Sequence, residues 1–83
     1  MSSERTERLV AMVNDIANFF TAEPDRAVAV EGVRNHLRRY WEPRMRHKII
    51  AHLREHDGEG LGDLARAGVE KLAESEAAEA AAG

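Results

Sequence analysis

Hydrophobic residues recur at helical spacing in four segments of the chain, and the first spans about residues 3–20. At 100° per residue its apolar side chains fall on one arc, which covers nearly half of the helix circumference. The members of that arc are Leu9, Val10, Met12, Val13, Ile16, Ala17, Phe19 and Phe20. One neighbouring helix requires a narrower stripe. The arc therefore predicts either packing against two other helices of the same domain or exposure of part of it to another protein.

The second helical segment runs from about Pro24 to Trp41. Pro24 suits the first helical position, because the backbone N–H that proline lacks would have no helical partner there. The apolar side chains of one face are Ala29, Val30, Val33, Leu37, Tyr40 and Trp41. Gly32 interrupts the segment at a cost of about 1 kcal/mol relative to Ala. A close approach of a neighbouring backbone would explain this glycine.

Pro43 separates the second segment from the third. In a continuous helix its ring would clash with the carbonyl of Arg39, and it disfavours the α conformation of Glu42. The alternatives are one long kinked helix, or one helix that ends at Trp41 and another that begins at Pro43. The two steric effects favour the break.

The third and fourth segments complete the pattern. The third ends near Asp57, because the run 58–60 (GEG) is a strong terminating signal, and the fourth begins within residues 61–63. Their inward side chains are Met45, Ile49, Leu53, Leu61, Ala65, Val69 and Leu72, with Gly68 permitting tight packing. After Ala73 the composition favours helix but offers nothing large to bury. The sequence predicts an all-α bundle of three to four short helices (residues 1–73) and a fraying or disordered tail (74–83).

Length, charge and cysteine content narrow the class of protein. The chain has 83 residues, a formal net charge of −3 and no cysteine. One small domain follows, and disulfides, iron–sulfur ligation and thiolate zinc sites are excluded. The apolar run 9–20 contains Asn14, Asp15 and Asn18, so it is too short and too polar to span a bilayer. With no secretory signal ahead of this run, we expect a cytoplasmic protein that binds no membrane.

The segment 34–48 concentrates the unusual residues of the chain. It holds six of the twelve Lys and Arg residues, the only Trp and the only Tyr. Its basic side chains are Arg34, Arg38, Arg39, Arg44, Arg46 and Lys48. Three interpretations remain open: a solvated face paired in part with Glu31 and Glu42, docking onto a protein, or phosphate binding by a small helical nucleic-acid-binding regulator. The negative net charge and the proline-made turn count against the third interpretation.

Aromatic and histidine side chains offer two further candidate sites. Tyr40 and Trp41 suit a buried core and a protein interface equally well. His52 and His56 belong to an H-x-x-E-H match at 52–56, the inverted zinc-protease signature. A catalytic zinc site needs a third ligand and a cleft, so we reject a functional metal site here. No nucleophile elbow, phosphate-cradling loop or carboxylate pair is evident, so no catalytic residue is proposed.

Three stretches together resemble a known family. They are DIANFF at 15–20, EPD at 23–25 and, most specifically, HLRRYWEPRMR at 36–46. The chain resembles the delta subunit of the soluble, NAD-dependent, molybdenum-containing formate dehydrogenases of bacteria. The likeness spans roughly residues 9–72, and the tail after Ala73 lies outside it.

This resemblance implies a small accessory subunit that binds the large catalytic subunit and supports assembly or stability of the complex. Molybdopterin, iron–sulfur clusters, FMN and NAD would be carried by the other subunits, and this chain would hold no cofactor. Self-association of the isolated chain through its wide first arc stays open. The resemblance implies no catalytic residue. The expected contacts are therefore chosen because aromatic and arginine side chains often dominate binding at protein interfaces. The expected partner-binding residues are Arg38, Arg39, Tyr40, Trp41, Pro43, Arg44, Met45 and Arg46.

Overall fold

Four helices form the protein in a computed structural model that describes residues 2–82, with side chains from residue 6 onward. They are α1 (Ser2–Phe20), α2 (Arg26–Tyr40), α3 (Pro43–His56) and α4 (Asp63–Ala82). No strand occurs within residues 2–82, so the predicted all-α class is confirmed. Met1 and Gly83, the outer ends of the predicted domain and tail, lie outside the described residues. No helix in the described part of the chain is long and apolar enough to cross a membrane.

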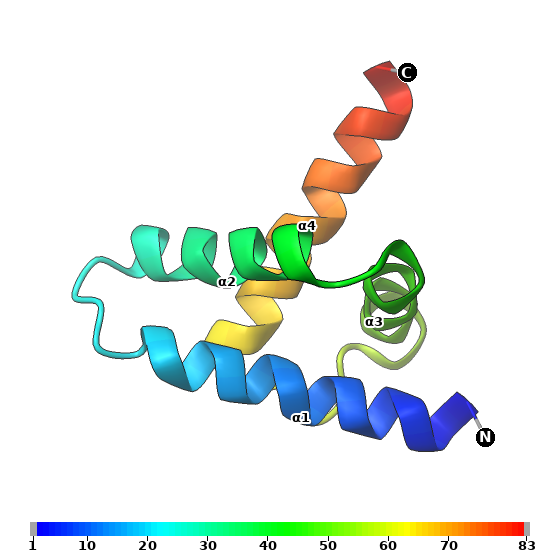
Figure 1. The fold of residues 1–83 in the computed structure, drawn as a ribbon, viewed down its shortest axis with the longest axis horizontal. Coiled ribbons are helices and arrows are strands. Elements are labelled where there is room, and N and C mark those ends of the chain that lie inside the picture. The colour runs from blue at the N-terminus through cyan, green and yellow to red at the C-terminus, as the bar shows by residue number, and fades with distance from the viewer. Residues whose placement is uncertain (1, 83) are drawn as a thin grey trace.

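The helices pack as a hairpin that is crossed by a third helix and closed at one end by a fourth. Figure 1 shows α1 and α2 running antiparallel, α4 crossing them, and α3 lying across the end where α2 finishes. The C-terminal turns of α4 extend beyond the body of the bundle (Figure 1). α1 contacts all three other helices, and α4 likewise contacts α1, α2 and α3.

The core draws on every helix. Its fully buried side chains are Val13, Val33, Leu37, Ile49, Val69 and Leu72. Most of the broad arc of α1 is used inside the bundle: Leu9, Val13 and Ala17 are buried, and its other members pack partly against them. Phe19 is the exception, because it is 79% exposed. The structure therefore favours packing within the domain for most of the arc.

The beginning of α2 differs from the prediction. Pro24 precedes the helix, and Asp25 is its N-cap, with the carboxylate accepting hydrogen bonds from the backbone N–H of Ala27 (3.0 Å) and of Val28 (3.4 Å). These two N–H groups have no helical acceptor, so a capping carboxylate at this position stabilises the helix start. The predicted start at Pro24 is wrong because the cap lies one residue further along.

The break at Pro43 is confirmed. α2 ends at Tyr40, Trp41 and Glu42 are extended with ψ of 139° and 152°, and α3 begins at Pro43. Two extended residues between consecutive helices turn the chain sharply, so α3 leaves the direction of α2 (Figure 1). This turn brings the end of α2 and the start of α3 into one surface.

Gly32 and Gly68 both lie at close contacts between helices. A Cβ atom added to Gly68 would lie 2.7 Å from the Cβ of Val33, which confirms the predicted tight packing of α4 on α2. One added to Gly32 would lie 2.6 Å from Cδ1 of the Phe20 ring. The neighbour of Gly32 is therefore a side chain, and the predicted close approach of a backbone is wrong.

Residues 74–82, for which the composition predicts a fraying helix or disorder, continue α4 as regular helix to Ala82. α4 starts after the 60–62 loop, to which the side chain of Asn14 on α1 makes two hydrogen bonds. The Asn14 amide donates to the carbonyl of Gly60 (3.0 Å) and accepts from the N–H of Gly62 (2.8 Å). The position of α4 is thus fixed at its start by a polar contact with α1. The division into a domain and a flexible tail at residue 73 stays a prediction.

Candidate functional site

The last turn of α2, the extended link and the first turn of α3 form a surface that we call the corner, residues 38–46. All eight residues predicted to bind a partner lie in it. They separate by burial into an inner set and an outer set. The inner set is Arg38, Trp41, Met45 and Arg46, and the outer set is Arg39, Tyr40, Pro43 and Arg44.

Trp41 belongs to the core of the bundle. Its side chain is 5% exposed and packs in the cluster that contains Leu37 and Ile49. Its backbone N–H donates to the carbonyl of Leu37 (3.1 Å), and its own carbonyl accepts from Nη1 of Arg46 (2.7 Å). The indole anchors the corner from inside, so it offers little surface to a partner.

Arg46 and Glu76 form the most enclosed ion pair at the corner. Nε of Arg46 donates to Oε2 of Glu76 at 2.6 Å, and the two side chains are only 13% and 16% exposed. Because Arg46 also bonds the Trp41 carbonyl, one guanidinium joins the end of α2 to α4. Charge-assisted hydrogen bonds of this kind are stronger than neutral ones, so this pair fixes the corner against α4.

Arg38 and His47 complete the contact with the end of α4. Arg38 donates to Glu79 and lies 3.9 Å from Oε2 of Glu76, while Nε2 of His47 lies 3.5 Å from Oε1 of Glu76. Three basic side chains thus lie within 4 Å of the Glu76 carboxylate. The sequence reasoning missed Glu76 and Glu79, because it treated the residues after Ala73 as a tail without contacts.

The outer set faces solvent. Tyr40 is 70% exposed, and its ring lies 4.9 Å from that of His36, one turn earlier on α2. Arg39, Pro43 and Arg44 are also exposed. Among the described side chains, no carboxylate lies within ion-pair distance of Arg39 or Arg44. An exposed tyrosine with two available guanidinium groups is the composition found at protein interfaces.

Arg34, at the edge of the basic segment, pairs with Glu31 on the same helix. Nη2 of Arg34 donates to Oε1 of Glu31 at 2.6 Å. Three of the six basic residues of the segment 34–48, namely Arg34, Arg38 and Arg46, therefore bind carboxylates of this chain. Fewer cations are left for phosphates than the sequence alone suggested.

The hydrogen bond from Arg34 lowers the pKa of Glu31 below its ordinary value of 4.5, and the slight desolvation of the carboxylate opposes this shift. A lowered pKa in the folded state means that the pair stabilises the fold above the pKa of the unfolded chain, and that this contribution is lost as the pH falls through the folded value. We expect Arg34→Gln to raise the pKa of Glu31 towards 4.5, as measured by carboxyl ¹³C NMR titration. Arg54→Gln is the control, and an equal shift in that variant would contradict the assignment.

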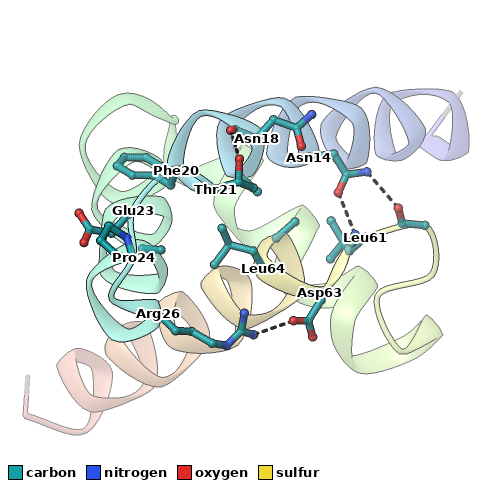
Figure 2. Close-up of a pocket in the computed structure, with 15 residues that line it drawn as sticks. Asn14, Asn18, Phe20, Thr21, Glu23, Pro24, Arg26, Leu61, Asp63 and Leu64 are labelled. Atoms are coloured by element: carbon teal, nitrogen blue, oxygen red, sulfur yellow. Dashed lines mark hydrogen bonds and ion pairs between the residues drawn. The ribbon is translucent and has the colours of Figure 1, made fainter.

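A groove of about 740 Å³ lies away from the corner, between the end of α1, the link to α2 and the start of α4. Arg26 pairs with Asp63 at 3.0 Å, and the hydroxyl of Thr21 donates to the carbonyl of Asn18 at 2.7 Å. Figure 2 shows both contacts, together with Asn14 bound to the 60–62 loop. Arg26 and Asp63 pair with each other, whereas Asn14 and Thr21 bond backbone groups. Phe20, Leu61 and Leu64 supply apolar lining.

The two histidines of the H-x-x-E-H match line a smaller hollow of about 470 Å³. Their ring centroids are 5.7 Å apart, and Nε2 of His52 lies at hydrogen-bond distance (2.8 Å) from the carbonyl of Glu59. Across the described residues, no group of three or more His, Asp or Glu side chains is arranged to hold a metal ion. The prediction that the chain binds no functional metal stays a prediction.

Fold and corner together define a small helical domain whose candidate site is a basic and aromatic surface. Comparison with family models gives a match over residues 8–69, about three quarters of the chain, to the FdsD family, the NADH-dependent formate dehydrogenase delta subunit. The chain belongs to this family. Neither a search of curated proteins nor a search of solved structures returned a match.

Proposed function

We propose that this chain is a non-catalytic accessory subunit, which binds the large catalytic subunit of an NADH-dependent formate dehydrogenase and supports its assembly or stability. The observation that carries the proposal is the family match over residues 8–69. A chain without cysteine has no thiolate for an iron–sulfur cluster. The iron–sulfur clusters therefore belong on the other subunits, and from the family membership we assign molybdopterin, FMN and NAD to those subunits as well.

The outer set of the corner is the face that we assign to the catalytic subunit. Tyr40 offers a large exposed ring at a helix end. Arg39 and Arg44, also exposed in the corner, add charges that no described carboxylate pairs with. Aromatic rings and guanidinium groups carry much of the binding energy in protein interfaces, whereas scattered aliphatic side chains carry little. Trp41 supports this face from the core.

Co-purification tests the proposal directly. A tagged chain expressed with the other formate dehydrogenase subunits of the same source is expected to retain them through purification and gel filtration. Expression without the chain is expected to lower the yield of assembled, active complex. Unchanged assembly and activity together with no retained subunit would overturn the proposal.

A substitution at Tyr40 tests the face. Tyr40→Ala is expected to weaken binding to the other subunits by about tenfold or more, since truncating an interface hot spot costs about 2 kcal/mol or more and about 1.4 kcal/mol is tenfold. Because the ring is 70% exposed, the melting temperature should hardly change. Affinity is measured by biolayer interferometry and stability by circular dichroism.

Val28→Ala is the matched control for Tyr40→Ala. Val28 also lies on α2 and is 50% exposed, but it is three turns away from the corner. We expect this variant to bind as the unaltered chain does. Equal losses in the two variants, or no loss in either, would remove Tyr40 from the interface.

A further inference from the structure

The end of α4 covers the inner cations of the corner. We call residues 74–82 the strap. Its Glu76 binds Arg46 and approaches Arg38 and His47, and its Glu79 binds Arg38. Two of the eight predicted partner-binding residues are thus already occupied by carboxylates of the chain itself.

Charge, rather than apolar burial, holds the strap in place. Leu72 is the last fully buried side chain of α4, and every residue from Ala77 to Ala82 is exposed. The pair between Arg38 and Glu79 is itself 37% and 52% exposed, and exposed ion pairs are weak because water screens them. The contact between Arg38 and Glu79 can therefore be exchanged for an equivalent one at small cost, whereas the pair between Arg46 and Glu76, 13% and 16% exposed, is the firmer of the two.

The strap also lies beyond the part of the chain that the family model matches. The family match ends at residue 69, whereas Glu76 and Glu79 both follow it. Arg38 and Arg46 lie inside the match. The cations thus lie within the matched region, and the carboxylates that bind them lie on its C-terminal side.

We propose that the strap is an intramolecular competitor for the corner: Glu76 and Glu79 hold Arg38 and Arg46 until carboxylates of the catalytic subunit replace them. This inference rests on the proposed function. The occupant of the opened surface is an acidic segment of the partner, because carboxylates are the groups that the surface binds in this structure. When the binding-competent state is only partly populated, the apparent affinity falls by that fraction.

Competition and a purely structural role of the strap predict opposite changes in the affinity for the partner. If the strap only supports the fold, neutralising its carboxylates weakens both the fold and the binding of the partner. If the strap competes, the same change weakens the fold but tightens binding. The sign of the change in affinity, read beside the melting temperature, separates the two roles.

The test uses the full chain carrying Glu76→Gln and Glu79→Gln, which keep side-chain size and remove both charges. The probe is purified formate dehydrogenase assembled without this subunit. We expect the double variant to bind about fivefold to tenfold more tightly than the unaltered chain while melting at a lower temperature. The control carries Glu55→Gln and Glu70→Gln, which alter the net charge equally at exposed positions outside the strap, and its binding should not change.

Unchanged or weaker binding by the strap variant would overturn the competition, and so would equal tightening in the control. Failure of the unaltered chain and of both variants to bind the probe would overturn the proposed function itself. The two failures are distinguishable, because the first leaves the unaltered chain bound.

Discussion

Replacing Trp41 with Ala is expected to lower the free energy of unfolding by about 3–5 kcal/mol, the range for truncating a buried aromatic side chain. Trp41 is 5% exposed and packs in the core cluster at the point where α2 ends. The whole stability of a small domain is about 5–15 kcal/mol, so a large share would be lost. Because this is the only Trp of the chain, urea unfolding should be followed by circular dichroism rather than fluorescence.

Trp41→Phe serves as the control, since it keeps an aromatic ring in the cavity and should cost much less than the alanine variant. Tyr40→Ala provides the contrast on the surface, with a change in stability of about 0.5 kcal/mol or less. A Trp41→Ala variant that keeps full stability but loses affinity for the other subunits would place the indole in the interface instead.

Tyr40 and Trp41 show what the sequence alone could not predict, namely which of two adjacent aromatic side chains is buried. The periodicity of α2 puts Tyr40 and Trp41 on one apolar face, and both suit a core or an interface. The structure separates them, because α2 ends between them and Trp41 adopts an extended backbone. The ring of Tyr40 then remains outside, against His36. A helical projection places a side chain on a face only as long as the helix continues.

Local chemistry made much of the fold predictable. The steric effect of proline on its neighbours indicated the break at Pro43, and the glycine-rich run at 58–60 marked the end of α3. The close packing at Gly68 also followed from the position of a glycine on an apolar stripe. Each of these features depends on a few neighbouring residues or on a simple period.

Contacts between distant residues were not predictable in the same way. Asn14 holds the 60–62 loop, and Glu76 binds Arg46 thirty positions away. Neither pairing has a periodic signature, because each depends on how whole helices are placed in space. The corner could therefore be proposed as a stretch of sequence, but its division into inner and outer sides required the fold.

Enlarging Gly68, where α4 packs closely against α2, is expected to cause the second large loss of stability. Gly68 is buried on α4, and an added Cβ would lie 2.7 Å from the Cβ of Val33, which is fully buried on α2. Gly68→Val is expected to lower the free energy of unfolding by about 3 kcal/mol or more, at the upper end of overpacking costs. Gly68→Ala should show a smaller loss, because its better helix propensity offsets part of the clash.

Gly32→Ala tests whether the mobility of the contacted side chain decides how much stability an added Cβ costs. The chemical change is the same as in Gly68→Ala, and the added Cβ would again lie close to another atom, 2.6 Å from Cδ1 of the Phe20 ring. Phe20 is only partly buried and lies at the end of α1, so its ring can turn aside, whereas Val33 is held on all sides. We expect Gly32→Ala to change stability little or to raise it by up to about 1 kcal/mol. Equal losses at Gly32 and Gly68 in urea unfolding would show that the freedom of the neighbouring side chain does not set the cost.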